Sequence, residues 1–264
     1  MKEFLEAIFL GIIQGLTEFL PVSSSGHLEL AKALIGYQSE ESLKFTIVVH
    51  GGTVLSTIVV FRKEILELIK GLFKFKYNEE TKYVLKIAIS MIPIFVVGIF
   101  FKDELESIFV GNILLVGVAL LFTGALLMFT HFAKSREREV SYRDSFLIGL
   151  SQAVAVIPGI SRSGSTIASA LLLGVKKEAA ARFSFLMVLA PIIGANLLDM
   201  LKYDPSAEVA GSSGAGVLLA GFVASFLTGW LACTWMINIV KKGKLTYFAI
   251  YCFIVGIIAI ATSF

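Results

Sequence analysis

Two polar stretches interrupt the apolar sequence, and each carries residues that could do chemistry. The first, "FLPVSSSGHLEL", spans residues 19–30 and follows an apolar run. Just before it, Gln14 and Glu18 stand four residues apart, so a helix would present them on one face. His27 follows the serines and could act as base, acid or nucleophile. A carboxylate and an imidazole beside hydroxyls suit hydrolysis, although Glu18 alone could be an interfacial charge and His27 a structural polar residue.

The second stretch, "PGISRSGST", contains four hydroxyl side chains and Arg162 at the expected start of a short helix that runs to Val175. A helix start offers unpaired N–H groups and the positive end of the helix dipole. Together with a guanidinium fork and hydroxyl donors, this predicts an anion site suited to phosphate. The alternative is that the serines only cap the helix and Arg162 snorkels to the surface. The anion site is favoured because an arginine within a membrane is costly and usually functional.

The composition predicts that both stretches lie in an integral membrane protein. The chain has 264 residues, of which 56% are hydrophobic and 16% charged, and its mean hydropathy is +0.84. About 20 apolar residues are needed to cross the hydrocarbon core. Six segments are long enough: 45–61, 84–101, 112–132, 183–201, 215–240 and 246–263. The chain is therefore expected to form one membrane domain, residues 1–264, without a soluble domain.

The two polar stretches also belong to an internal repeat. A shift of 138 positions without a gap superposes Gln14 on Gln152, and it places Ser23, Ser25 and Gly26 on Ser161, Ser163 and Gly164. One common offset predicts two repeats, residues 1–138 and 139–264.

Each repeat would contain one interrupted segment followed by three full spans. The interrupted segments, 4–35 and 145–178, have halves too short to cross alone, which favours re-entrant helical hairpins. The odd number of crossings would invert one repeat relative to the other, so that the two breaks can meet near the middle of the membrane. The expected fold is an all-α polytopic membrane protein with two inverted repeats.

Charge placement predicts the orientation of this fold. The loops 62–82, 133–144 and 241–244 are rich in lysine and arginine, which puts them in the cytoplasm by the positive-inside rule. The opposite side then receives both termini and two acidic loops, one with Asp103, Glu104 and Glu106 and the other from Asp204 to Glu208.

The two motifs resemble the signatures of the undecaprenyl pyrophosphate phosphatase family, the BacA-type bacitracin-resistance enzymes. "QGLTEFLPVSSSGH" corresponds to the family's (E/Q)xxxE pattern with its following PVSSxGH, and "PGISRSGST" to its PGxSRSxxT pattern. The resemblance covers essentially the whole chain. It implies hydrolysis of undecaprenyl pyrophosphate to undecaprenyl phosphate and inorganic phosphate, which recycles the lipid carrier for cell-wall synthesis and confers bacitracin resistance. It also implies a multi-pass protein of the cytoplasmic membrane with its active site open to the outer face.

The resemblance also implies roles for single residues. Glu18, Ser24, His27 and Arg162 would be catalytic, and the substrate would be bound by Gln14, Ser23, Ser25, Ser161, Ser163, Gly164 and Thr166. Ser24 is favoured over His27 as nucleophile because a small hydroxyl can approach phosphorus closely. His50 and Glu29 receive no role.

A divalent cation, Mg²⁺ or Ca²⁺, is the cofactor that the family implies. Glu18 would bind it together with substrate phosphates and water. Gln14 stands where many relatives have glutamate, which argues against a metal site with two carboxylates. The expected partners are an isoprenyl pyrophosphate lipid and membrane lipids, without nucleic acid; a homodimer and the preferred lipid chain length are left open.

A transporter is the alternative class, because inverted repeats with broken helices also occur in transporters. The protein would then be a lipid-phosphate flippase or an anion transporter. The pair of Glu18 and His27 favours hydrolysis, since anion transport needs neither a base nor an acid.

Overall fold

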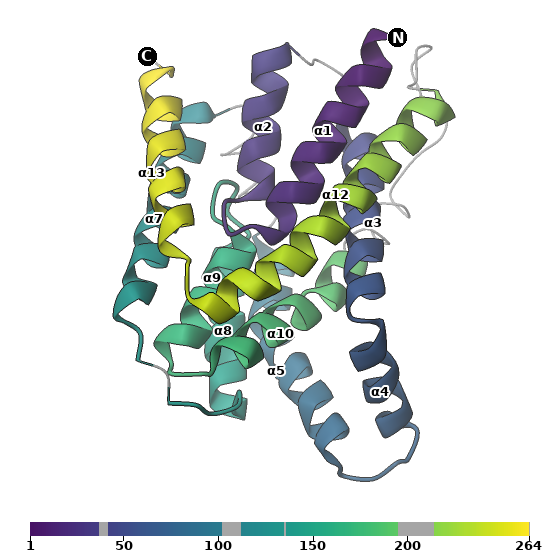
Figure 1. Cartoon of the computed structure of the whole chain (residues 1–264), viewed down its shortest axis with the longest axis vertical. Coiled ribbons are helices and arrows are strands. Elements are labelled where there is room, and N and C mark those ends of the chain that lie inside the picture. The colour runs from purple at the N-terminus through teal and green to yellow at the C-terminus, as the bar shows by residue number, and fades with distance from the viewer. Residues whose placement is uncertain (37–41, 102–111, 135, 195–213, 264) are drawn as a thin grey trace.

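The computed structural model describes residues 1–36, 42–101, 112–134, 136–194 and 214–263, and within these ranges the chain is helical and forms no β-sheet (Figure 1). The helices are α1 (Lys2–Phe19), α2 (Ser24–Ile35), α3 (Ser42–Val60), α4 (Arg62–Leu72), α5 (Glu79–Phe100), α7 (Ile113–Phe129), the 3₁₀ turn η1 (Thr130–Phe132), α8 (Tyr142–Val154), α9 (Arg162–Leu172), α10 (Lys177–Met187), α12 (Ala215–Lys242) and α13 (Thr246–Ala261). This confirms the prediction of an all-α polytopic membrane protein.

Three described helices are long and apolar enough to cross a membrane by themselves: α5, α7 with the turn that follows it, and α12. They coincide with three of the six expected spans. α3 and α4 together form a further candidate, although they are bent by 75° where they join. α13 is apolar but shorter than a full span. The expected span 183–201 begins within α10, and its part from residue 195 onward lies outside the described residues, as do both acidic loops.

The prediction that residues 62–82 form a loop is wrong for the first half of this segment, which forms the helix α4. The reason is that apolar side chains recur in this segment with helical spacing among the charged ones. Leu68 and Gly71 are buried, while Lys63, Glu67 and Lys70 are exposed. The basic charge of the segment therefore lies on a helix as well as on the turn that follows.

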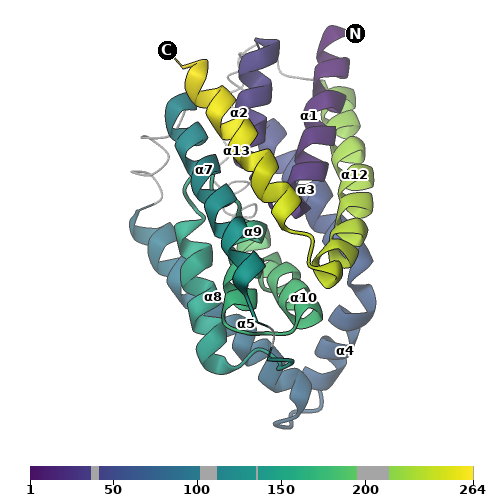
Figure 2. The same cartoon turned by 60° about the vertical axis from the view of Figure 1, so that its left-hand side comes forward.

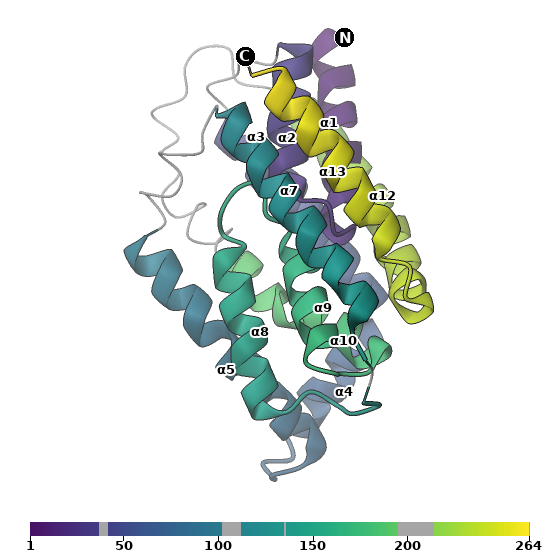
Figure 3. The same cartoon turned by 90° about the vertical axis from the view of Figure 1, so that its left-hand side faces the viewer.

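The two interrupted segments fold as helix pairs that enter the molecule from opposite ends. In Figure 1 both chain termini lie at the top, where α1 and α2 occupy the upper half, whereas α8, α9 and α10 occupy the lower half. The turned view agrees with this arrangement (Figure 3). The break between α1 and α2 and the break before α9 consequently lie near the middle of the molecule.

The longer helices surround these pairs. α12 packs along α1, and α13 runs beside α7 (Figure 2). Helix packing in a membrane depends on small residues that let backbones approach closely. At the α1–α12 contact, a Cβ added to Gly11 would lie only 2.5 Å from the carbonyl oxygen of Gly221, so glycine is required at this position.

Arg138 connects the two ends of the α8–α9 pair that lie away from the break. Its guanidinium forms an ion pair with Asp144 in the first turn of α8, with one hydrogen bond of 3.0 Å, and also donates to the carbonyl of Leu173 at the end of α9 (2.7 Å). Asp144 belongs to a capping box with Ser141. Arg138 thus ties the start of α8 to the end of α9.

Candidate active site

The two breaks are in direct contact. The hydroxyl of Ser163, from the second motif, donates to the carbonyl of Leu20 in the first break (3.2 Å). A Cβ added to Gly26 would lie 3.2 Å from the Cα of Gly159, and Gly159 itself has a φ of +92°. The contact between the breaks therefore depends on glycine in both motifs.

Serines start the helix after each break. Ser23 is the N-cap of α2 and accepts a hydrogen bond from the backbone N–H of Gly26 (3.3 Å), although its φ of 71° is unusual for a residue other than glycine. Ser161 is the N-cap of α9 and accepts from Gly164 (3.0 Å). The two caps occupy equivalent positions in the repeat, which explains why both motifs need a serine three residues before a glycine.

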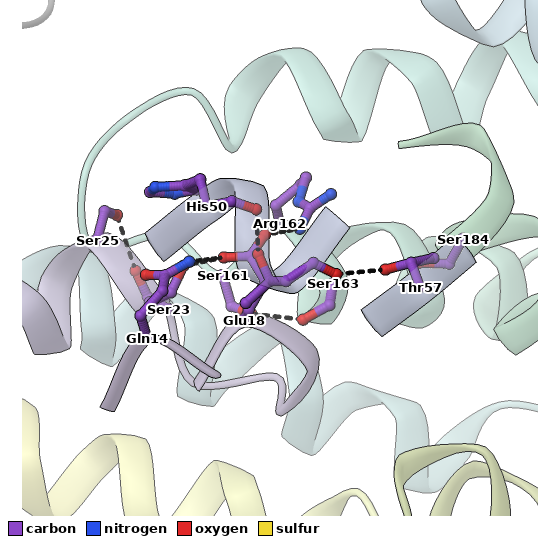
Figure 4. A network of polar contacts seen from close by, with 12 residues as sticks. Gln14, Glu18, Ser23, Ser25, His50, Thr57, Ser161, Arg162, Ser163 and Ser184 are labelled. Atoms are coloured by element: carbon purple, nitrogen blue, oxygen red, sulfur yellow. Dashed lines mark hydrogen bonds and ion pairs between the residues drawn. The ribbon is translucent and has the colours of Figure 1, made fainter. Parts of the chain in front are cut away.

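Glu18 is the centre of the polar cluster at this contact. It is 6% exposed and accepts hydrogen bonds from Gln14 (2.8 Å) and Ser24 (2.6 Å) on the same carboxylate oxygen, Oε2. Its other oxygen, Oε1, forms an ion pair with Arg162 of α9 (Figure 4). Burying a carboxylate is costly unless it is paired and hydrogen-bonded, and these contacts meet both conditions.

The contact between Ser24 and Glu18 has the geometry of a nucleophile with its base. The serine hydroxyl donates its proton towards the carboxylate over 2.6 Å. Loss of that proton to Glu18 would activate the oxygen for attack on phosphorus. Arg162 lies on the other side of the same carboxylate, where its charge can attract an oxyanion.

A cavity of about 340 Å³ opens beside this cluster. Its polar lining comes from Glu18, Ser23, Ser24, Ser25, Thr46, His50, Gln152 and Arg162. Apolar side chains such as Ile94, Val188 and Ile192 form further parts of the wall. A cavity with both kinds of lining suits a ligand that has a charged head and an apolar chain.

The cavity brings together five of the residues singled out from the sequence, namely Glu18, Ser23, Ser24, Ser25 and Arg162. The other expected substrate-binding residues are not part of its lining: Gln14, Ser161, Ser163, Gly164 and Thr166. Gln14 lies behind Glu18, and the hydroxyl of Thr166 contacts that of Ser184 on α10 (2.5 Å). The second motif thus builds the start of α9 with its hydroxyls and reaches the cavity through its arginine, and the substrate-binding roles of these five residues stay predictions.

His27 points away from the cavity. Its Nδ1 donates to the carbonyl of Ser23 (2.8 Å), and its Nε2 accepts from the hydroxyl of Tyr251 on α13 (2.8 Å). The two rings also stack, with centroids 5.5 Å apart. Both ring nitrogens are therefore engaged away from Glu18, and a catalytic role for His27 stays a prediction that would require the side chain to move.

His50 is the imidazole that lines the cavity. Its Nδ1 donates to the carbonyl of Thr46 one turn earlier in α3 (2.8 Å), and its Nε2 has no hydrogen-bond partner among the residues that the structure describes. A hydrogen bond of this kind fixes the tautomer and the orientation of the ring. The sequence signal for His50 was a titratable residue within an apolar span, which is a functional hypothesis by default.

The oxygen donors beside the cavity fit a hard divalent cation in part. They are the carboxylate of Glu18 and the hydroxyl of Ser24. Oxygen ligands suit Mg²⁺ or Ca²⁺. In the part of the chain that the structure describes, no three His, Cys, Asp or Glu side chains converge as a metal cage. A cation bound here would thus need further oxygens from substrate and water.

Comparison with known proteins adds an independent line of evidence. The model of the family described as "Bacitracin resistance protein BacA" matches residues 7–258. The undecaprenyl-diphosphatase of Bacteroides fragilis is 58% identical over 262 residues, which cover 99% of this chain and 98% of that protein. The undecaprenyl-diphosphatase of Parabacteroides distasonis is 59% identical over 98% of this chain and 97% of its own. The undecaprenyl-diphosphatase of Methanosphaera stadtmanae is 40% identical, and the match covers 100% of this chain and 99% of that protein.

Proposed function

The chain belongs to the BacA family of bacitracin resistance proteins, and from this premise we propose that it hydrolyses undecaprenyl pyrophosphate to undecaprenyl phosphate and inorganic phosphate. Family membership confirms the resemblance of the two motifs. The observation that carries the activity itself is the cluster of Ser24, Glu18 and Arg162 beside the cavity. Its substrate is an isoprenyl pyrophosphate lipid of the membrane.

In the proposed mechanism, the pyrophosphate head enters the cavity and Arg162 holds the terminal phosphate. Nη2 of Arg162 contacts Glu18, while Nη1 is buried without a partner in the part of the chain that the structure describes and can donate to a phosphate oxygen. Ser24 attacks the terminal phosphorus and gives its proton to Glu18. The bond from phosphorus to the bridging oxygen breaks, and that oxygen leaves on the lipid monophosphate.

Water completes the reaction. It attacks the phosphoserine, and the bond between Oγ of Ser24 and phosphorus breaks. Glu18 returns its proton to Ser24, and inorganic phosphate leaves. A divalent cation held by Glu18 together with substrate oxygens and water would neutralise charge on the pyrophosphate oxygens.

We further propose that the fold consists of two inverted repeats, 1–138 and 139–264, each starting with a re-entrant hairpin. Helix bounds support this. Adding 138 to Ser24–Ile35 gives 162–173, and α9 spans Arg162–Leu172; the same shift of Glu79–Phe100 gives 217–238, which lies within α12. The α1–α2 pair and the α8–α9 pair enter the molecule from opposite ends, which agrees with two repeats that are inverted relative to each other.

The proposed orientation places both termini outside and opens the cavity to the outer face. The supporting observation is that the end of the molecule opposite the termini carries the turn after α4 with Lys74 and Lys76, and the start of α8 with Arg143. Positive charge of this kind favours the cytoplasmic side. A flippase or anion transporter is not favoured, because the relatives at 56–59% identity are named for hydrolysis.

Phosphate release by the purified protein tests the proposal. The substrates are a C55 and a C15 isoprenyl pyrophosphate, and the variants are Ser24→Ala and Arg162→Ala. We expect release by the wild-type protein and a loss of about 10²–10⁴-fold in kcat/KM for each variant. Thr234→Ala, at an exposed position of α12, serves as the control and should match the wild type. A wild-type protein that releases no phosphate would refute the activity, and undiminished release by both variants would refute the site.

A further inference from the structure

Gln152 is a buried side chain whose hydrogen-bonding capacity is unused. It lies on α8, is 0% exposed and lines the same cavity as Glu18 and Arg162. Neither its Nε2 nor its Oε1 has a partner among the residues that the structure describes. Its amide therefore presents one unfilled donor group and one unfilled acceptor at the wall of a polar cavity.

An unpaired buried amide is rare because it costs free energy that nothing in the protein offsets. The equivalent residue of the first repeat, Gln14, is used differently. It donates to Glu18 over 2.8 Å, so only its Oε1 is unfilled. The second repeat has no carboxylate four residues after its glutamine, since position 156 is Val156. Gln152 is thus free to bind something other than the protein.

The neighbouring groups define the chemistry of that ligand. Arg162 also lines the cavity, and its Nη1 is a second buried donor for which the described ranges of the chain hold no partner. Two such donors, Nε2 of Gln152 and Nη1 of the positively charged Arg162, match the oxygens of a phosphate. The acceptor Oε1 matches a group that donates, and a water molecule meets that need while lying close to the phosphate.

We infer that Gln152 binds the terminal phosphate through Nε2 and orients the water that releases it through Oε1; this inference rests on the proposed function. Gln152 neither takes nor gives a proton. It holds the water so that its oxygen forms the new bond to phosphorus, while Ser24 leaves as in the mechanism above. Glutamine can serve phosphoryl transfer in this way because a single amide contacts both the phosphate and the nucleophile.

Two variants of nearly the same shape test the inference. Gln152→Met removes both polar atoms, and Gln152→Glu replaces the donor group with a negative charge. The measurements are kcat and KM for a C15 pyrophosphate, the thermal unfolding midpoint in detergent, and the shift of that midpoint by methylenediphosphonate, a pyrophosphate analogue whose P–C–P bridge cannot be hydrolysed. Ser225→Ala is the matched control, since Ser225 is a buried polar side chain outside the cavity lining.

For Gln152→Met we expect an unfolding midpoint equal to or above that of the wild type, because the unpaired amide is gone. We also expect kcat/KM to fall by about 10–100-fold and the shift by methylenediphosphonate to disappear. Gln152→Glu should raise KM above that of Gln152→Met, because the negative charge of the glutamate repels the pyrophosphate. Ser225→Ala should keep kcat/KM and the diphosphonate shift.

The inference is overturned if Gln152→Met keeps kcat/KM within about twofold of the wild type. It is equally overturned if the midpoint falls while kcat/KM per folded molecule and the diphosphonate shift persist, because Gln152 would then be structural. Should Gln152→Met not fold, the same criteria apply to Gln152→Glu. A wild-type protein without phosphatase activity would refute the proposed function instead, so the two failures are distinguishable.

Discussion

Glu18 shows how much of the proposed chemistry rests on one side chain. It accepts from Gln14 on its own helix, from Ser24 after the break and from Arg162, which is 144 positions away in the chain. A carboxylate within a membrane is tolerated only with such partners. The same partners prepare it for catalysis, because a paired and oriented carboxylate can take a proton from Ser24 while Arg162 attracts the phosphate.

The two histidines near the breaks should respond differently to substitution. We expect His50→Ala to lower kcat/KM by about 10–100-fold with little change in the unfolding midpoint, because His50 lines the cavity and only its Nδ1 is hydrogen-bonded to a described residue. His27→Ala should lower the unfolding midpoint, because it removes the hydrogen bonds with Ser23 and Tyr251. Phosphate release and thermal unfolding in detergent measure the two effects. The opposite pattern, with activity lost only in His27→Ala, would mean that His27 turns into the cavity.

At the scale of elements, the site depends on where helices stop and start. α1 ends after Glu18, α2 starts at Ser24 and α9 starts at Arg162, so the reacting groups lie within the first or last turn of their helices. Serine caps fix the two starts, and glycines allow the two breaks to touch. Small shifts of these helix ends would separate Arg162 from Glu18.

Gly159→Ala should disturb this contact. The residue has a φ of +92°, and a Cβ would lie 2.7 Å from the Cβ of Ala119 and 2.9 Å from the carbonyl oxygen of Val116. We expect a loss of about 2–4 kcal/mol in the free energy of unfolding, together with reduced activity. Gly98→Ala is the control, because a Cβ at Gly98 meets nothing within 4 Å. Equal unfolding midpoints for the two variants would contradict the proposed packing of the breaks.

The ion pair between Arg138 and Asp144 should make stability depend on pH. Burial raises the pKa of Asp144, but hydrogen bonds from Arg138 and Ser141 outweigh this and lower the pKa to about 2. Because an unfolded aspartate has a pKa of about 3.9, the stabilisation is complete above about pH 4 and is lost as the pH falls towards 2.

We therefore expect Asp144→Asn to lower the free energy of unfolding by about 1–3 kcal/mol at pH 7. Thermal unfolding at pH 7 and at pH 3 measures the effect, and the variant should lose less stability than the wild type between these two values. A variant with the same pH dependence as the wild type would show that Asp144 does not titrate in this window.

At the scale of the whole molecule, the two break-containing pairs meet from opposite ends, and the longer helices enclose them. In the proposed topology, this arrangement would keep irregular backbone and charged groups inside the protein at membrane depth, where lipid could not satisfy them. It also sets the polar cavity among apolar walls, so a lipid head can reach the serines while its chain stays in apolar surroundings.

Cysteine labelling tests the proposed orientation. Lys2, at the start of α1, and Lys76, in the turn between α4 and α5, are both exposed, and these two segments lie at opposite ends of the molecule, whereas the native Cys233 and Cys252 are buried. In intact cells, we expect a membrane-impermeant maleimide to label Lys2→Cys and to label Lys76→Cys only after permeabilisation. Activity of both variants confirms that they fold. The reverse labelling pattern would invert the proposed topology.

The sequence by itself determined the membrane class, the two breaks and the family. It also indicated Glu18 and Arg162, because helix periodicity and apolar length act over a few residues and can be read locally, whereas the choice of Ser24 rests on the family resemblance. The tertiary structure alone decided that His50 and Gln152 line the cavity while His27 turns to Tyr251. Those outcomes depend on the rotation of each helix about its axis and on contacts between residues far apart in the chain, which only the packing of the whole molecule fixes.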